Sequence, residues 1–279
     1  MNGYYDTQPR RRRFLLWPLV IAGVFAAFQY FSSQKYVNPE TGRVAHVALS
    51  EGQEAALGLQ SYEDVLSQSQ VVNSGPEVEL VQKVMKRLEA ATGEAGKTMD
   101  WQVSVVASSQ ANAFCLPGGK MVVYTGILPI TQSEAGLATV LGHEMAHATS
   151  RHGSQRLLES KVSDTLLTGA NAAIALGDMD MQKKMAVMGA LGAGAKYGVI
   201  LPFSRKHESE ADEIGLYYMA RAGYDPEEAI KFWERMEQNS NGAQPPEFMS
   251  THPSHGERIE RLKEHMPKAQ EEYAKARGQ

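Results

Sequence analysis

Five consecutive residues near the middle of the chain, His143-Glu144-Met145-Ala146-His147, have types and a spacing that suit metal-dependent hydrolysis. Side chains four residues apart lie on one face of an α-helix, so both imidazoles can reach the same metal ion while the carboxylate between them flanks it. This is the ligand geometry of a zinc hydrolase. The alternative is a pair of unrelated surface histidines on an amphipathic helix.

The residues before this pattern predict the helix that it requires. Thr131-Gln132-Ser133-Glu134 fits a capping box, in which the first residue caps the helix and the glutamate closes the turn. Apolar side chains then recur at helical spacing, at Leu137, Val140, Leu141 and Met145. We therefore expect the two histidines to share a helix face.

A catalytic zinc ion needs a third protein ligand and leaves its fourth position to water. Glu208 and Asp212 are four residues apart on a second predicted helix, which begins at the N-cap Ser204 and stops at Gly223. One carboxylate can bind the metal while the other accepts a hydrogen bond from a ligand histidine. The alternative is a solvated acidic helix face that carries Glu208, Glu210, Asp212 and Glu213.

Three motifs together resemble a known family. They are HEMAH at 143–147 followed by Arg151-His152, HESEAD at 207–212, and the stretch from Asn112 to Gly119. The chain resembles the gluzincin zinc metalloproteases of the HtpX and CAAX-prenyl-protease type. Within that group it is most similar to the OMA-type stress proteases of the mitochondrial inner membrane and their bacterial relatives. The likeness spans about residues 45 to 265.

The resemblance implies a role for each motif residue. His143, His147 and Glu208 would bind one zinc ion per chain, Glu144 would be the general base, and Asp212 would accept a hydrogen bond from a ligand histidine. Elementary chemistry agrees, because zinc lowers the pKa of a bound water and polarises the scissile carbonyl. Glu144 would take the proton of that water and deliver it to the leaving amine.

Strands are predicted on either side of the Asn112 stretch, at about 102–107 and 120–124. The resemblance makes Asn112 and Ala113 part of the edge strand against which an extended substrate lies, so that substrate binding reads mainly backbone. The alternative is an ordinary hairpin, for which the turn at Pro117-Gly118-Gly119 is a sufficient explanation.

A third segment of interest is His252-Pro253, which precedes a helix capped by Ser254 and Glu257. Arg258 lies on the first turn of that helix. Similar family members carry a His-Pro near the metal, where the imidazole could stabilise the oxyanion or bind zinc as an inhibitory ligand. Arg258 could stabilise the oxyanion or form a structural ion pair. Of the other histidines, His152 and His207 are expected to pack or to support the ligands, and the remaining ones to lie on the surface: His46, His255 and His265.

The N-terminus predicts a membrane location. Residues 1–13 end in Arg10-Arg11-Arg12-Arg13 and are expected to stay in the cytoplasm, and residues 14–31 carry no charge over 18 positions. We expect a single-pass anchor in a bacterial inner membrane, with the catalytic domain in the periplasm. The alternative is a signal peptide cut after Ala26. The bunched arginines and the lack of a serine-rich pattern argue against a mitochondrial transit peptide.

The predicted fold is α+β and mainly helical, a zincin-like metalloprotease domain with a small β-sheet and the HExxH helix. We expect a connecting segment over 32–49 and the protease domain over 50–279, with helices near 51–69 and 76–92 and another beginning at Asp225-Pro226. A net charge of −4 gives no reason to expect nucleic acid as a partner. The single cysteine, Cys115, excludes an internal disulfide and reads as a small buried apolar residue.

Residues 162–201 combine glycines with alanine, leucine, methionine and valine. Small residues permit close helix packing, which is the interpretation we favour. A second membrane span over 185–201 is weakened by Lys196 and four glycines. A lid over the active site is the third interpretation, with methionines as adaptable contacts.

Taken together, the residues and the resemblance predict a membrane-anchored zinc endopeptidase. Its expected substrates are misfolded or regulated membrane and envelope proteins, and its expected lipid contact is the N-terminal segment. The quality-control role rests on the resemblance alone. The alternative is a latent, chaperone-like zinc-binding factor whose metal is blocked by His252. The sequence leaves the oligomeric state open.

Overall fold

The structure, a computed structural model, describes residues 16–177, 180–195, 201–240, 246–252 and 257–278. The chain divides into two compact units. The first contains the residues up to Ser33 and those from Arg156 to Phe203, and the second contains Gln34–Gln155 and the residues from Ser204 onward. All the predicted site residues belong to the second unit.

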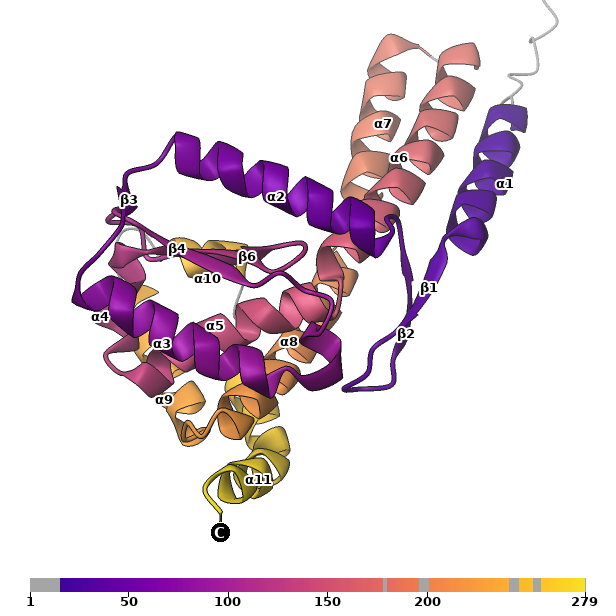
Figure 1. Cartoon of the computed structure of the whole chain (residues 1–279). Helices are drawn as coiled ribbons and strands as arrows, with labels where there is room; N and C mark the ends of the chain where they lie inside the picture. Colours follow the sequence, from indigo (N-terminus) through magenta and orange to yellow (C-terminus); the bar gives the residue numbers. More distant parts are fainter. Residues whose placement is uncertain (1–15, 178–179, 196–200, 241–245, 253–256, 279) are drawn as a thin grey trace, which may run out of the picture. The chain divides into compact units, whose positions relative to one another are not determined.

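A four-stranded sheet lies at the centre of the second unit (Figure 1). Its strands are β3 (Val71–Val72), β4 (Gln102–Val106), β6 (Lys120–Tyr124) and β5 (Ala113–Leu116), in that order across the sheet. The pairing of β4 with β6 is parallel and the other two pairings are antiparallel. Strand β5 is therefore an edge strand, as the resemblance predicts for the stretch that begins at Asn112.

Helices cover both faces of this sheet. Helix α2 (Glu51–Ser67) packs on one face, where Tyr62 contacts Val106 and Val122. Helices α3 (Pro76–Ala91) and α5 (Glu134–Thr149) lie on the other, where the alternate strand residues Val105 and Met121 join the main core. The alternation of side chains along a strand thus gives each sheet face its own apolar layer.

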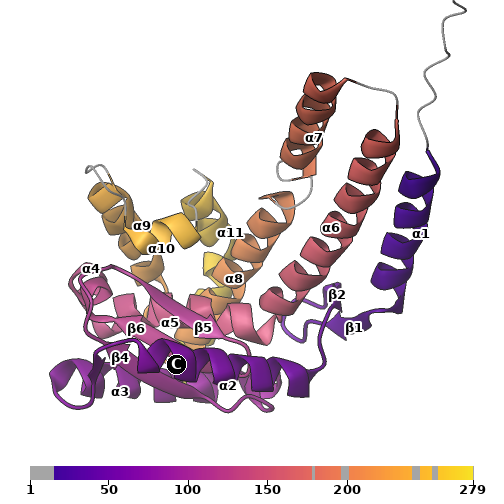
Figure 2. The same ribbon diagram turned by 90° about the horizontal axis from the view of Figure 1, so that it is seen from above.

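Helix α5 is buried nearly all round, from Gly136 to Thr149. Helices α8 (Leu201–Arg221), α9 (Glu227–Ser240), α10 (Glu247–Thr251) and α11 (Arg258–Ala276) follow it in the chain. Figure 2 shows α9, α10 and α11 grouped on one side of α5, with α2 on the other. A helix enclosed in this way has an apolar sequence on every face, and polar residues on it need a specific partner.

Several predicted elements differ from the structure at their ends. The N-cap of α5 is Ser133, whose Oγ accepts a hydrogen bond from Gly136 N, so the capping box predicted at Thr131 is wrong. Thr131 ends the short helix α4 (Leu128–Thr131), and Gln132 turns the chain through a left-handed conformation with φ 59° before Ser133. Helix α8 begins at Leu201 instead of Ser204. The predicted cap Ser254 lies outside the described residues.

Most of the segment 32–49 forms a hairpin of β1 (Gln34–Val37) and β2 (Val44–Val47) within the second unit, while Ser32 ends α1. Its turn is tied to α8 through Arg221, which forms two hydrogen bonds with the Glu40 carboxylate at 2.8 and 3.0 Å. The hairpin is thus folded onto the protease domain, where sequence alone predicts only a connection.

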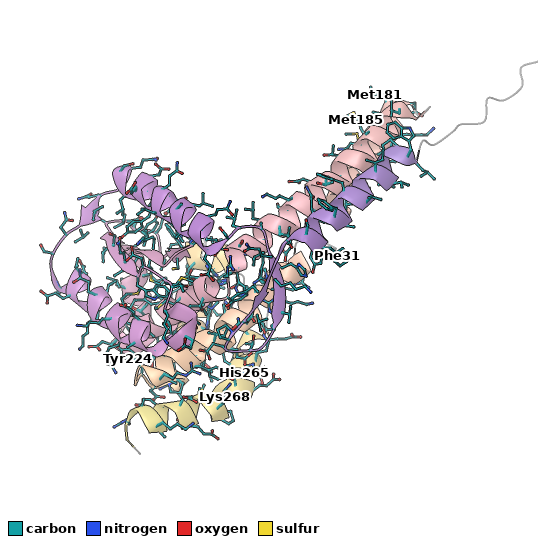
Figure 3. All side chains as sticks on the ribbon, turned by 45° about the vertical axis from the view of Figure 1, so that its right-hand side comes forward. Phe31, Met181, Met185, Tyr224, His265 and Lys268 are labelled. Atoms are coloured by element: carbon teal, nitrogen blue, oxygen red, sulfur yellow. The ribbon has the colours of Figure 1, made fainter. Side chains whose placement is uncertain are left out.

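In the first unit, α1 (Trp17–Ser32) runs antiparallel to α6 (His152–Leu176). A Cβ at Gly169 would lie 2.2 Å from the Ala22 Cβ, which is the close packing that small residues allow. Helix α7 (Met181–Ala195) carries Met181 and Met185, which are 71% and 68% exposed (Figure 3).

None of the helices in the described part of the chain is both long enough and apolar enough to cross a membrane. The predicted span over 14–31 begins in residues 14 and 15, which lie outside the described residues, and α1 covers residues 17–31 of it.

Two glycines set the distance between α5 and α8. A Cβ on Gly215 of α8 would lie 2.8 Å from His143 N and 2.9 Å from the Gly142 carbonyl carbon. A Cβ on Gly142 would lie 2.9 Å from Gly215 O. The backbones therefore touch directly at the level of the HExxH motif, and only glycine permits this approach.

We expect Gly215→Ala to lower the free energy of unfolding by about 1–3 kcal/mol, because the new methyl group meets backbone atoms that cannot rotate away. Denaturant unfolding of the purified protein measures this. Gly52→Ala in α2 is the matched control, because a Cβ there meets nothing within 4 Å. Equal stability of the two variants would contradict the close approach of α5 and α8.

Candidate metal centre

Helix α5 places three motif residues in the interior of the second unit. His143 is 3% exposed, Glu144 is 2% and His147 is 7%. The Nε2 atoms of the two histidines lie 3.1 Å apart, as their spacing of four residues on a helix predicts. The surface-histidine alternative is therefore wrong, since both rings are buried and converge.

Helix α8 brings Glu208 to the same point. Its carboxylate lies 3.2 Å from His143 Nε2 through Oε2 and 3.4 Å from His147 Nε2 through Oε1. Glu208 is 1% exposed. The structure thus brings together the three residues predicted to bind the metal.

His252, at the end of α10, supplies a fourth donor to this group. Its Nδ1 lies 3.2 Å from His143 Nε2 and 3.1 Å from Glu208 Oε2. One donor atom from each of the four side chains lies within 4.8 Å of the other three. The ring of His252 stacks on Phe248, with centroids 4.7 Å apart.

The donor set fits a zinc ion. Tetrahedral zinc with nitrogen or oxygen ligands at about 2.0–2.1 Å holds those ligands roughly 3.3 Å from one another. The five contacts described above among His143, His147, Glu208 and His252 range from 3.1 to 3.4 Å. Two imidazole nitrogens that both present lone pairs at 3.1 Å repel each other unless a cation lies between them.

The electrostatics of the site also favour a cation. Burial lowers the pKa of His143, but Asp212 and Glu208 outweigh it and bring the pKa to about 9. Burial lowers the pKa of His147 well below its usual value. Burial raises the pKa of Glu208, but His147, His143 and His252 outweigh it, so that this carboxyl is held ionised. The carboxylates therefore favour a positive charge between them, which a metal ion would supply in place of the His143 proton.

Asp212 and Arg258 lie behind the donor atoms. Asp212 Oδ1 is 3.0 Å from His143 Nδ1, the ring nitrogen that faces away from the other donors. Arg258 donates from Nε to Asp212 Oδ2 at 2.7 Å and from Nη2 to Glu208 Oε2 at 3.0 Å. Arg258 is 1% exposed, and its guanidinium lies over the Trp233 ring at 3.9 Å. These are the contacts of a structural ion-pair partner.

Glu144 has contacts on both sides. Its Oε2 accepts a hydrogen bond from the backbone N of Cys115 at 3.2 Å, and its Oε1 lies 3.3 Å from His252 Nε2. The sheet edge therefore orients one oxygen of this carboxylate and leaves the other near the donor cluster.

The outward-facing groups of β5 lie beside Glu144. Asn112 O pairs inward with Tyr124 N, and hydrogen-bonding direction alternates along a strand, so Ala113 and Cys115 point their backbone groups away from β6. Ala113 N donates to the side chain of Asn112 at 3.0 Å. Both predicted substrate-binding residues thus lie at or beside the edge strand, where Ala113 is buried and its N–H is covered by the Asn112 side chain.

The acidic segment of α8 is not a solvated face, because Glu208, Glu210 and Asp212 are all buried. Sequence reasoning missed Glu210, which lies 2.9 Å from His152 Nε2, and Phe248, for which no signal existed. His152 supports a ligand as expected, since its Nδ1 is 2.8 Å from His147 Nδ1, and His207 stacks on it. Two histidines expected on the surface, His46 and His265, are half-buried. His255 lies outside the described residues.

Comparisons with known proteins agree with this geometry. Residues 77–266 match Peptidase family M48. The chain is 34% identical over 271 residues to mitochondrial metalloendopeptidase OMA1 of Schizosaccharomyces pombe, a match that covers 95% of this chain and 76% of that protein. It is 32% identical over 301 residues to the OMA1 of Saccharomyces cerevisiae, covering 98% and 82%. It is 29% identical over 217 residues to the beta-barrel assembly-enhancing protease of Escherichia coli K12, covering 77% and 44%.

We expect Arg258→Ala to lower the free energy of unfolding by about 3–5 kcal/mol, because it leaves two buried carboxylates without their counter-charge. Denaturant unfolding of the metal-free protein measures the loss. Lys263→Ala on the same helix is the control, since Lys263 and its partner Glu260 are 54% and 67% exposed. A loss no larger than that of the control would mean that Arg258 does not balance these charges.

Proposed function

Since the chain belongs to peptidase family M48 and is a zinc metalloendopeptidase, we propose that His143, His147 and Glu208 bind its zinc ion. We propose that Glu144 is the general base. The observation that carries this assignment is the convergence of the three side chains at 3.1 to 3.4 Å in a buried site. Each of them offers a donor type that zinc accepts in catalytic sites.

When bound there, zinc supplies a Lewis acid that polarises the scissile carbonyl and acidifies water. Glu144 takes the proton of the attacking water and passes it to the leaving amine as the peptide bond breaks. The Cys115 N–H holds one oxygen of Glu144 in place at 3.2 Å, so the other is directed to the proton. Asp212 would accept a hydrogen bond from His143 Nδ1–H, which places the ring proton there and leaves Nε2 free as a ligand.

We propose that the substrate binds as an extended strand along β5. This edge carries the backbone groups of Ala113 and Cys115, and Cys115 also contacts the proposed base. Added strands bind through main-chain hydrogen bonds, which suits substrates of varied sequence. In the structure the Ala113 N–H donates a hydrogen bond to Asn112 Oδ1 at 3.0 Å. The Asn112 side chain would therefore rotate away when a substrate binds.

We propose that Arg258 acts through Glu208 and Asp212 and does not touch the substrate. Its guanidinium group already donates hydrogen bonds in the structure, from Nε to Asp212 and from Nη1 to the His252 carbonyl oxygen. Its burial between α8 and Trp233 supports this role over that of an oxyanion stabiliser.

We propose misfolded or regulated membrane and envelope proteins as substrates, and a single-pass location in a bacterial inner membrane with the catalytic domain in the periplasm. In this scheme residues 1–13 are cytoplasmic, 14–31 are the anchor, 32–49 connect, and 50–279 form the protease domain. Support comes from the apolar surface of α1, where Val24, Phe28 and Phe31 are 65% to 77% exposed and would be stabilised by lipid. Cleavage after Ala26 would instead release the domain.

A second candidate function is supported by the position of His252. Its Nδ1 stands among the proposed ligands, and its Nε2 lies 3.3 Å from Glu144 Oε1. This is where water and substrate must enter between the metal and the base. We propose that the structure represents a latent state, in which His252 takes the fourth ligand position and must move before catalysis. A latent factor of this kind could bind clients while seldom cleaving them.

We expect Glu144→Gln to retain one zinc ion per chain and to lose cleavage by about 10²–10⁴-fold, because the amide cannot accept the proton. Digestion of unfolded casein by the detergent-purified full chain, together with metal analysis, measures both properties. Glu134→Gln at the start of α5 should cleave normally. A Glu144→Gln protein that digests casein at the normal rate would remove Glu144 from the mechanism.

We expect His252→Ala to raise the cleavage rate of the zinc-loaded full chain several-fold, because it opens the fourth ligand position. The same casein assay checks this, with the zinc content measured in parallel. A fall in rate at unchanged zinc content would refute latency and indicate that His252 stabilises the oxyanion.

A further inference from the structure

The second ring nitrogen of His147 leads away from the metal centre. His147 Nδ1 lies 2.8 Å from His152 Nδ1, and His152 Nε2 lies 2.9 Å from Glu210 Oε2. His152 is 0% exposed and Glu210 is 8%. Three buried side chains in contact therefore form a series from a proposed zinc ligand to a carboxylate on α8.

A metal at one end of this series and the Glu210 carboxylate at the other determine which ring nitrogen of each histidine carries its proton. A metal on His147 Nε2 requires the proton of that ring to be on Nδ1, and the Nδ1 of His152 must then accept it. The proton of His152 is consequently on Nε2, which donates a hydrogen bond to the Glu210 carboxylate at 2.9 Å. Each of the three groups therefore holds the next one in a single orientation.

Glu210 is in turn held by the β1–β2 hairpin. Arg43 donates from Nε to both carboxylate oxygens at 2.9 Å and from Nη2 to Oε2 at 2.5 Å. The Thr41 hydroxyl donates to Oε1 at 2.8 Å, and Asn38 Nδ2 donates to the same oxygen at 3.1 Å. All three donors belong to the turn that joins β1 to β2. A carboxylate with this many donors is fixed in direction.

The other ligand histidine is oriented by a separate route. His143 contacts Asp212 directly, and Asp212 is held by Arg258 of α11. The carboxylates behind the two proposed histidine ligands are thus held by different arginines, Arg43 of the hairpin and Arg258 of α11. Because groups behind a ligand set its ring orientation and basicity, each arginine acts on the metal through its carboxylate.

We propose that Glu210 is a positioning residue for zinc binding, acting on His147 through His152, and that Arg43 of the hairpin holds Glu210 in this role. The inference rests on the proposed function, in which His147 is a zinc ligand. It assigns to the segment 32–49 a part in the metal centre that a simple connection would not have.

The test measures zinc affinity of the full chain by competition with a chromophoric chelator. We expect Glu210→Gln to bind zinc roughly 10-fold or more weakly, as is typical when a group behind a ligand is lost. Arg43→Gln should weaken binding in the same direction. Glu40→Gln is the matched control. Glu40 lies in the same turn, but its carboxylate pairs with Arg221 and takes no part in holding Glu210.

A second readout separates positioning from general stability. The cobalt-loaded Glu210→Gln protein should show a shifted visible absorption band, whereas cobalt-loaded Glu40→Gln should match the wild type. Melting temperatures of the metal-free proteins report the structural cost of each substitution. If Glu210→Gln does not fold, Arg43→Gln decides the question, since its side chain is 36% exposed.

Zinc affinities of Glu210→Gln and Arg43→Gln that equal that of Glu40→Gln would overturn the proposal. Weakening by Glu210→Gln alone would overturn the part played by the hairpin. A wild-type chain that binds no zinc would instead refute the proposed function, so the two failures are distinguishable.

Discussion

The burial of two carboxylates on one turn of α8 is the constraint on which the structure depends. Glu208 and Asp212 are 1% and 6% exposed, and an isolated buried charge of this kind costs several kcal/mol. Arg258 balances both from one side, and the imidazoles of α5 face them from the other. Helices α5, α8 and α11 therefore meet at these charges, and residues of the same helices also belong to the apolar core around them.

This arrangement explains why so much of the domain surrounds a single helix. Helix α5 has no face left for solvent, so its polar residues must find partners inside the protein. His143 contacts Asp212, Glu144 accepts a hydrogen bond from the backbone of β5, and His147 contacts His152. Each partner comes from a different element. The sheet edge, α8 and the start of α6 thus take their positions from what α5 requires.

Local spacing predicts that each pair of residues shares a helix face, the resemblance supplied the roles within each pair, and distance along the chain explains what was missed. His143 and His147 share a helix turn, as do Glu208 and Asp212, so elementary geometry brings each pair to one face. Glu210 lies between the latter two on another face, and its partner Arg43 is 167 residues away. No local rule connects them. The hairpin was missed for the same reason, because its short strands are held by contacts with α8 that only the fold reveals.

The ion pair between α8 and α11 also bears on how the protein is made. Glu208 and Arg258 are separated by 50 positions in the chain. On a ribosome, the HExxH helix emerges well before either of them, and the carboxylates of α8 emerge before the arginine that neutralises them. A nascent chain therefore holds only part of a metal site, and its negative charges stay hydrated until α11 arrives.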